Sequence, residues 1–191
     1  RDYRNYVVPI NGTPDIGAYE YGSYLGALDS KGTNHLMVTG ADVGLTGKLS
    51  RAYTFDGTDY LGDLTSRVSS LELTSAISIS AWFKTNVSDS SAHTLVSNYS
   101  SDYGYFLGMD SSYHIEWQIG NGASTAKKTT SSTYNNNTWY HVVATFDGFN
   151  LYLFINGVEI GGTPVTWSNN IAYNADCRFI IGARNNANVQ E

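Results

Sequence analysis

Aromatic rings interleaved with amides and carboxylates are the groups in this sequence best suited to chemistry, and the chemistry they suit is sugar binding. A sugar packs the C–H face of its ring on an aromatic ring, while amide and carboxylate groups bind its hydroxyls. Each ring also has a plainer interpretation, because large aromatic side chains are mostly buried. Strand alternation fits a core position for Trp117, for example. The candidate sugar-binding residues, on or beside expected loops, are Tyr99, Tyr103, Tyr105, Trp117 and Trp167.

Acidic residues that could cleave a polysaccharide are present but isolated. A retaining glycosidase needs two carboxylates about 5–5.5 Å apart, which a strand supplies with acids at positions i and i+4 of its wet face. Glu72, Glu116 and Glu159 each lack such a partner. A lyase would need a His or Tyr base beside an Arg or Asn, and the partial match around His114 has no nearby Arg. The sequence therefore predicts no catalytic residue in this chain.

Two acidic residues around a glycine turn could hold a calcium ion. The segment FDGTD places Asp56 and Asp59 on an expected loop, and carboxylate oxygens on a loop suit Ca²⁺. An ordinary Asp-Gly turn explains the same residues equally well. The histidines are scattered, and no two have the spacing of zinc ligands. The metal prediction is therefore one calcium ion at Asp56 and Asp59.

The composition limits the classes of partner that the chain could bind and indicates the kind of protein to which it belongs. The chain has 191 residues, a net charge of −6 and 15% charged residues, which is below the usual quarter. Nucleic acid would need a clustered basic stripe, and the one basic doublet, Lys127-Lys128, is typical of a solvated loop or strand edge. The absence of a long hydrophobic span argues against membrane insertion. A start at Arg1 favours a segment excised from a larger protein.

The elements expected to position these residues are short antiparallel strands. In residues 138–160, apolar and polar residues alternate, and Asp147-Gly148 and Asn156-Gly157 supply the turns of two hairpins. Residues 77–84 alternate as in a sheet with one dry face. The pattern predicts an all-β sandwich or barrel. Strands are expected at residues 51–56, 77–84, 93–98, 103–109, 113–120, 138–147, 150–156 and 178–183.

Five segments, in order along the chain, carry a resemblance to a known family. They are Ala52–Asp59 (AYTFDGTD), Ile77–Lys84 (ISISAWFK), Trp139–Gly148 (WYHVVATFDG), Leu151–Gly157 (LYLFING) and Phe179–Gly182 (FIIG). With these landmarks the chain resembles the laminin-G-like, concanavalin A-like jelly-roll family found in extracellular bacterial proteins. The resemblance implies an antiparallel jelly-roll sandwich over residues 24–191, often with one structural calcium that Asp59 would help to bind. The family's last strand is not recognisable before Glu191, so one strand is expected to be missing.

Residues 1–23 stand apart as a linker or the tail of a preceding domain. Their segment TPDIGAYEYG resembles the end of secreted bacterial parallel β-helix domains, although an N-terminal edge strand with a linker fits as well. Residues Tyr3–Ile10 are rich in β-formers, with Pro9 near the end of the run. We expect this segment to add as a strand, either to its own sandwich or to that of a neighbouring copy.

Together these patterns predict a non-catalytic recognition module of a secreted or cell-surface protein, with a polysaccharide or cell-surface glycan as its partner. A structural or adhesive unit that packs by strand addition against copies of itself or neighbouring domains is the alternative. A polysaccharide-active enzyme is a third alternative, because related folds include glycoside hydrolases and lyases. Nucleic acid binding and membrane insertion are not expected.

Overall fold

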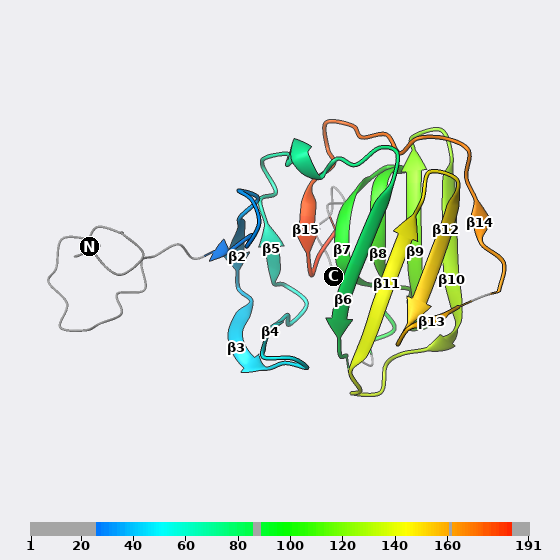
Figure 1. The fold of residues 1–191 in the computed structure, drawn as a ribbon. Coiled ribbons are helices and arrows are strands. Elements are labelled where there is room, and N and C mark those ends of the chain that lie inside the picture. Colours follow the sequence, from blue (N-terminus) through cyan, green and yellow to red (C-terminus); the bar gives the residue numbers. More distant parts are fainter. Residues whose placement is uncertain (1–25, 86–88, 161, 185–191) are drawn as a thin grey trace, which may run out of the picture.

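Two antiparallel sheets packed face to face form the body of the domain in the computed structural model (Figure 1). The structure describes residues 26–85, 89–160 and 162–184. The prediction of an all-β antiparallel sandwich is confirmed. Residues Tyr3–Ile10, expected to add as a strand, lie outside the described residues.

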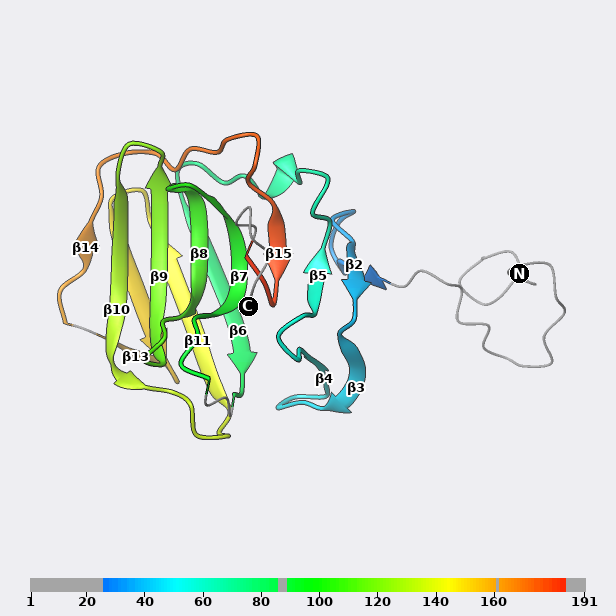
Figure 2. The same ribbon diagram turned by 180° about the vertical axis from the view of Figure 1, so that it is seen from behind.

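The larger sheet has eight strands in the order β1-β2-β5-β15-β7-β8-β9-β10 and is seen in front in Figure 2. Neighbouring strands in its second half are joined along the chain by short turns, as the turn residues predict. Its strands are β1 (Gly26–Ala27), β2 (Leu36–Thr39), β5 (Tyr60–Gly62), β15 (Phe179–Ile181), β7 (His93–Ser100), β8 (Tyr103–Met109), β9 (His114–Asn121) and β10 (Thr125–Thr133).

The smaller sheet has the order β13-β12-β11-β6, with β14 also paired to β12. A separate two-stranded hairpin, β3-β4, lies beside it, and a short 3-10 helix, Ser69–Leu71, precedes β6. The strands are β6 (Ile77–Phe83), β11 (Tyr140–Phe146), β12 (Asn150–Ile155), β13 (Val158–Glu159), β14 (Val165–Thr166), β3 (Asp42–Thr46) and β4 (Arg51–Thr54).

The core lies between the two sheets and follows the period of two along each strand. In β11 and β12, the inward side chains are buried while those between them stay partly exposed. The eight-stranded sheet contributes Leu107 and Trp117, and the smaller sheet contributes Val142, Leu151 and Leu153, all fully buried. Each such aliphatic side chain stabilises the fold by about 1.5–3 kcal/mol relative to an exposed one.

One edge of the smaller sheet has no partner among the described strands. β6 pairs with β11 on one side alone, and β4 pairs with β3 alone. The inward residues Ile79 and Ala81 on β6 are half-buried, whereas their ladder partners Ala144 and Val142 on β11 are fully buried. The sandwich is therefore incompletely closed along β6, on the side where β4 lies (Figure 1).

The sequence interpretation did not find β10, which forms an edge of the eight-stranded sheet, nor did it find β1, β2, β3, β5 and β14. The expectation of a strand edge at Lys127-Lys128 is met, but the expectation of a solvated pair is wrong for Lys128, which is only 4% exposed. Its Nζ donates a hydrogen bond to the carbonyl of Thr163 (3.0 Å) and lies 3.6 Å from Glu159. A buried ammonium needs such partners, which sequence spacing did not reveal.

Candidate functional site

The outer face of the smaller sheet carries the best candidate for a binding site. A shallow depression of about 490 Å³ lies where β6, β11 and the β12–β13 turn meet, and we call it the outer-face depression. Strand alternation points Trp82 and His141 outward, because their neighbours Phe83 and Val142 are buried. The lining residues are Lys48, Trp82, Trp139, His141, Asn156 and Gly157.

A paired tryptophan and histidine form the floor of the outer-face depression. Trp82 and His141 are opposite each other in the β6–β11 ladder, and their rings stack with centroids 5.1 Å apart. The His141 Nε2 lies 2.8 Å from the Ser80 hydroxyl, which fixes the ring orientation. These contacts hold the rings in place, and Trp82 nevertheless keeps 37% of its surface exposed. A rigid, exposed indole is the kind of surface on which a sugar ring packs.

A tight turn places a polar group at the rim. Asn156 and Gly157 have φ angles of 51° and 82°, as a type I′ turn requires. The Asn156 Oδ1 accepts a hydrogen bond from the backbone N–H of His141 (2.9 Å). In the described part of the chain, no residue accepts from the Asn156 Nδ2, so its N–H groups remain available to a ligand hydroxyl.

Two lysines cover the aromatic rings of the outer-face depression. Lys48, from the loop between β3 and β4, holds its Nζ 5.4 Å from the centroid of the Trp82 ring. Lys84, just after β6, holds its Nζ 5.4 Å from the centroid of the Trp139 ring. Both distances are within the range of a cation–π contact. The depression therefore combines aromatic surface, an amide and the Lys48 ammonium group, and the Lys84 ammonium lies over Trp139 at its edge.

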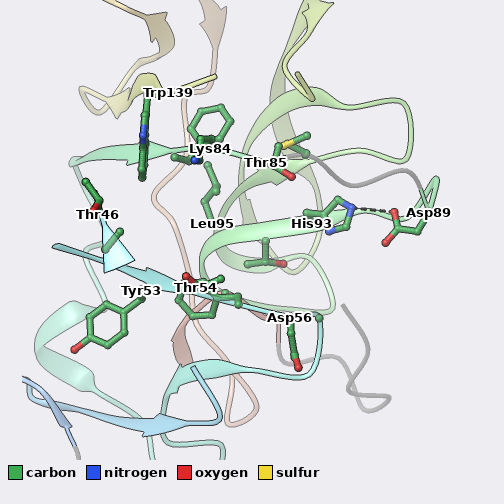
Figure 3. A pocket seen from close by; sticks show the side chains of 17 residues that line it. Thr46, Tyr53, Thr54, Asp56, Lys84, Thr85, Asp89, His93, Leu95 and Trp139 are labelled. Carbon is green, nitrogen blue, oxygen red and sulfur yellow. Dashed lines mark hydrogen bonds and ion pairs between the residues drawn. The ribbon is translucent and has the colours of Figure 1, made fainter. Parts of the chain in front are cut away.

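A second hollow of about 480 Å³ lies between β4 and the end of β6, and we call it the slot (Figure 3). In Figure 3, Lys84 and Trp139 lie at one end of it, and the His93–Asp89 pair (3.1 Å) lies at another. Because Trp139 lines both hollows, the slot and the outer-face depression are neighbours. Part of the lining of the slot is apolar and comes from β4 and the residue after it, from β6, from β7 and from β8. These residues are Ala52, Tyr53, Phe55, Phe83, Leu95 and Met109.

Most of the aromatic residues predicted to bind sugar are buried instead. Trp117 is 0% exposed and its Nε1 donates to the carbonyl of Thr145 in the opposite sheet (3.1 Å). Tyr105 is also buried, and its hydroxyl donates to the carbonyl of Leu71 (3.1 Å). Trp167 is buried beside β14. These three rings present no face to a ligand. Their assignment to sugar binding is therefore corrected, and they belong to the core.

The remaining two predicted residues are Tyr99 on β7 and Tyr103 on β8 of the eight-stranded sheet. The Tyr99 hydroxyl donates to the Asp102 carboxylate (2.6 Å) and accepts from Gln118 (2.7 Å). Burial, followed by the hydrogen bond to Asp102, raises the pKa of Tyr99 well above its usual range. Because Tyr99 is buried, its assignment to sugar binding is corrected as well. Tyr103 is half-buried, so the structure does not bring the five predicted residues together on one surface.

The residues of the outer-face depression were not predicted as a site. Alternation along residues 77–84 puts Trp82 on the face opposite Ile77, Ile79, Ala81 and Phe83, and this was the available signal. The contact of His141 with Ser80 is typical of a hydrogen-bonded structural histidine. The contribution of Lys48 had no sequence signal, because it comes from a hairpin outside the smaller sheet.

The isolated acids lie in ion pairs with bases. The Arg67–Glu72 pair is 2.6 Å long, and so is the Lys127–Glu116 pair. Glu159 lies 3.6 Å from Lys128.

The predicted calcium ligands form a hydrogen-bonded turn. The Asp56 Oδ1 accepts from the backbone and hydroxyl of Thr58 (2.9 and 2.8 Å), and these bonds lower the pKa of Asp56. The Asp59 Oδ2 accepts from the backbone of Asp56 (3.1 Å). Across the residues that the structure describes, no group of three His, Cys, Asp or Glu side chains could hold a metal ion. The two carboxylates supply hard oxygen atoms but not, by themselves, a complete site.

Calcium at Asp59 stays a prediction, and chelation tests it. An ion that binds the native state alone stabilises it by mass action, so EDTA should lower the melting temperature and excess CaCl₂ should restore it. Asp59→Asn should remove this effect. Asp63→Asn is the matched control, because Asp63 caps Thr65 in the same manner and should leave the EDTA effect intact. Equal melting temperatures with EDTA and CaCl₂ would show an ordinary turn.

Comparison with family models matches residues 55–190 to Laminin_G_3, described as the concanavalin A-like lectin/glucanases superfamily. No curated protein sequence is significantly similar to the chain. In the described residues, no helix is long and apolar enough to cross a membrane.

Several solved structures share the fold at low sequence identity. Domain 4 of AbnA, a GH43 extracellular arabinanase from Geobacillus stearothermophilus in complex with arabinotriose, is 16% identical with a TM-score of 0.52; the match covers 82% of this chain and 70% of that one. The receptor-binding domain of botulinum neurotoxin C/D mosaic serotype is 16% identical with a TM-score of 0.55, covering 78% and 39%. The binding domain of botulinum neurotoxin DC in complex with SialylT is 15% identical with a TM-score of 0.50, covering 78% and 38%.

Proposed function

Since the chain belongs to the concanavalin A-like lectin/glucanases superfamily, we propose that it is a non-catalytic glycan-binding module of an extracellular protein. The outer-face depression is its binding site in this proposal. One observation carries the assignment: Trp82 presents an exposed indole that is held in place by His141 beside the amide of Asn156. The pairing of glutamates with bases supports binding over hydrolysis.

The geometry would bind a sugar with little ordering of the protein. The stacked Trp82 and His141 rings already have one orientation, so little side-chain entropy is lost when a sugar packs on them. The Asn156 amide is fixed by its bond to the β11 backbone and can donate to a ring hydroxyl. The shallow shape suits the side of a polysaccharide chain more than a small molecule enclosed in a cavity.

The similar structures support the class of ligand. One of them is an arabinanase domain in complex with arabinotriose, and another is a neurotoxin binding domain in complex with SialylT. The arabinanase is extracellular, which fits the setting expected from the composition of this chain. At 15–16% identity these proteins share the fold with this chain, and ligand identity must come from binding experiments.

Truncating the exposed indole tests the site. Trp82→Ala should weaken binding to the best ligand from a glycan array at least about tenfold, because the sugar loses its packing surface. Isothermal titration calorimetry measures the change. Phe149→Ala is the matched control, since Phe149 is 55% exposed in the turn between β11 and β12, away from the outer-face depression. Equal affinity of the Trp82 variant and the native protein would place the site elsewhere.

Assembly by strand addition is a second candidate function, and the slot favours it. β4 and β6 each have an edge without a partner among the described strands, and residues of both line the slot. An extended strand in the slot would pair with one of these edges, and apolar lining residues such as Leu95 and Met109 would cover its inner side chains. We propose Tyr3–Ile10 as this strand, from the same or a neighbouring copy. The 15 residues between Ile10 and Gly26 can span up to about 50 Å.

Removing the proposed strand tests the second candidate. Deleting residues 1–10 should lower the melting temperature, if the strand adds within one chain, or abolish oligomers seen by light scattering, if it adds between copies. Val7→Pro should act in the same direction, because proline removes a backbone donor from the middle of the strand. A deletion variant with unchanged melting temperature and unchanged mass in solution would identify residues 1–10 as a passive linker.

A further inference from the structure

We propose that the outer-face depression prefers glycans that carry negative charge, as a carboxylate or a sulfate group. This inference rests on the proposed glycan-binding function of the same site. None of the six lining residues is acidic, while Lys48 is among them and Lys84 stands over the lining residue Trp139. The whole chain has a net charge of −6, so this surface differs in sign from the rest of the protein.

Both lysines lie over aromatic rings, and neither has an acidic partner among the residues that the structure describes. In the described part of the chain, the Nζ atoms of Lys48 and Lys84 have no ion pair or hydrogen bond, and their contacts are the rings of Trp82 and Trp139 at 5.4 Å. An ammonium placed over a ring keeps its N–H donors for a ligand. Lys127 shows the contrast, because it is neutralised by Glu116 at 2.6 Å.

The acidic groups near Lys48 and Lys84 in the fold already interact with other residues. Asp89, in the adjoining slot, pairs with His93, and Asp56 accepts hydrogen bonds within its own turn. Glu159, on β13 beside β12, lies 3.6 Å from Lys128 on the opposite sheet. None of these carboxylates is recorded as a partner of Lys48 or Lys84. An anionic ligand would therefore meet both ammonium groups without displacing an internal ion pair.

The geometry suggests how an anionic sugar would lie. Its ring would pack on the exposed part of the Trp82 indole, and the Lys48 ammonium, which lies over this ring in the free protein, would move aside to meet the charged group. A carboxylate or sulfate at the edge of the sugar would then lie near the lysines, and a hydroxyl would reach the Asn156 amide. Because both ammonium groups are exposed, their contribution should be modest and sensitive to salt.

A ligand pair that differs in charge alone provides the test. Oligogalacturonate and its fully methyl-esterified form have the same sugar rings, and carrageenan oligosaccharides and their desulfated, neutral form provide the corresponding pair for sulfate. At 20 mM NaCl, at least one charged form should bind about tenfold more tightly than its neutral partner. The difference should shrink towards onefold at 500 mM NaCl, where the Debye length is only a few ångströms. Which pair shows the larger ratio distinguishes a carboxylate from a sulfate ligand.

Variants separate this inference from the proposed function. The double variant Lys48→Gln/Lys84→Gln should reduce the charged-to-neutral ratio to about one while neutral binding persists. Lys31→Gln is the charge-matched control, because Lys31 lies in the β1–β2 loop, outside the lining of the depression, and should leave the ratio unchanged. Ratios near one for both pairs in the native protein, with binding still lost in Trp82→Ala, would overturn the charge preference alone. Binding that does not depend on Trp82 would overturn the proposed site.

Discussion

Replacing Trp117 with alanine should destabilise the domain by about 3–5 kcal/mol, which is a large part of the stability of an ordinary domain. Trp117 is 0% exposed at the centre of β9 and packs near Tyr105, with ring centroids 6.4 Å apart. Its indole N–H also bonds the carbonyl of Thr145, so it links the eight-stranded sheet to the smaller one. Alanine would leave a cavity between the sheets and remove this bond.

Urea denaturation followed by circular dichroism measures this loss. Trp82→Ala is the comparison, because it removes the same side chain from an outward position and should cost less than about 1 kcal/mol. Tryptophan fluorescence is a poor probe here, since both variants remove a fluorophore. A similar loss of stability in the two variants would contradict the assignment of Trp117 to the core.

The strand pattern could be predicted because it depends on short-range features. Alternation and the Asn156-Gly157 turn were enough to place β11 and β12 and their hairpin, and the same reasoning placed β6. β10 was not predicted, because TAKKTTSST has few apolar residues. Its inward positions hold Ala126, Lys128 and Thr130, and the burial of a lysine there depends on Thr163 in another element.

The sugar-binding residues could not be assigned from alternation alone. Alternation separates the two faces of β8 and β9, but on β8 both faces are buried, so Tyr105 and Phe106 are hidden alike. On the outer face, Arg184 lies 4.9 Å from the centre of the Phe106 ring although it is 78 residues away in sequence. Burial of an outer-face ring by a residue this distant in sequence is a result of the tertiary fold, and the pattern of a single strand does not predict it.

The residues of the outer-face depression were missed for the same reason, because they come together only in the tertiary fold. Trp82 and His141 become neighbours through the β6–β11 register, although the two strands are more than fifty residues apart in sequence. Lys48 reaches the Trp82 ring from a hairpin that pairs with neither main sheet. Alternation assigns Trp82 and His141 each to one face of its strand, yet their convergence with Lys48 depends on the sheet order, which the sequence pattern does not contain.

Gly104→Ala should cost about 2–5 kcal/mol, because two effects add at this position. Gly104 has φ +85°, a conformation that costs an L-residue about 1–2 kcal/mol. An added Cβ would also lie 1.8 Å from the carbonyl oxygen of Asn98 on the neighbouring strand β7. The obstacle is backbone, so β7 and β8 would have to separate, and overpacking of this kind typically costs about 1–3 kcal/mol.

Gly157→Ala isolates the first of these effects, the cost of the positive φ angle. Gly157 has φ +82°, but a Cβ there meets nothing within 4 Å, so its loss should be confined to the backbone term of about 1–2 kcal/mol. The difference between the two variants in urea denaturation then measures the close approach of β7 and β8 alone. Equal losses would mean that the strands adjust freely at Gly104. A larger loss at Gly104 would show that the centre of the eight-stranded sheet is rigid, as it must be to hold the core against which the smaller sheet and its outer face are positioned.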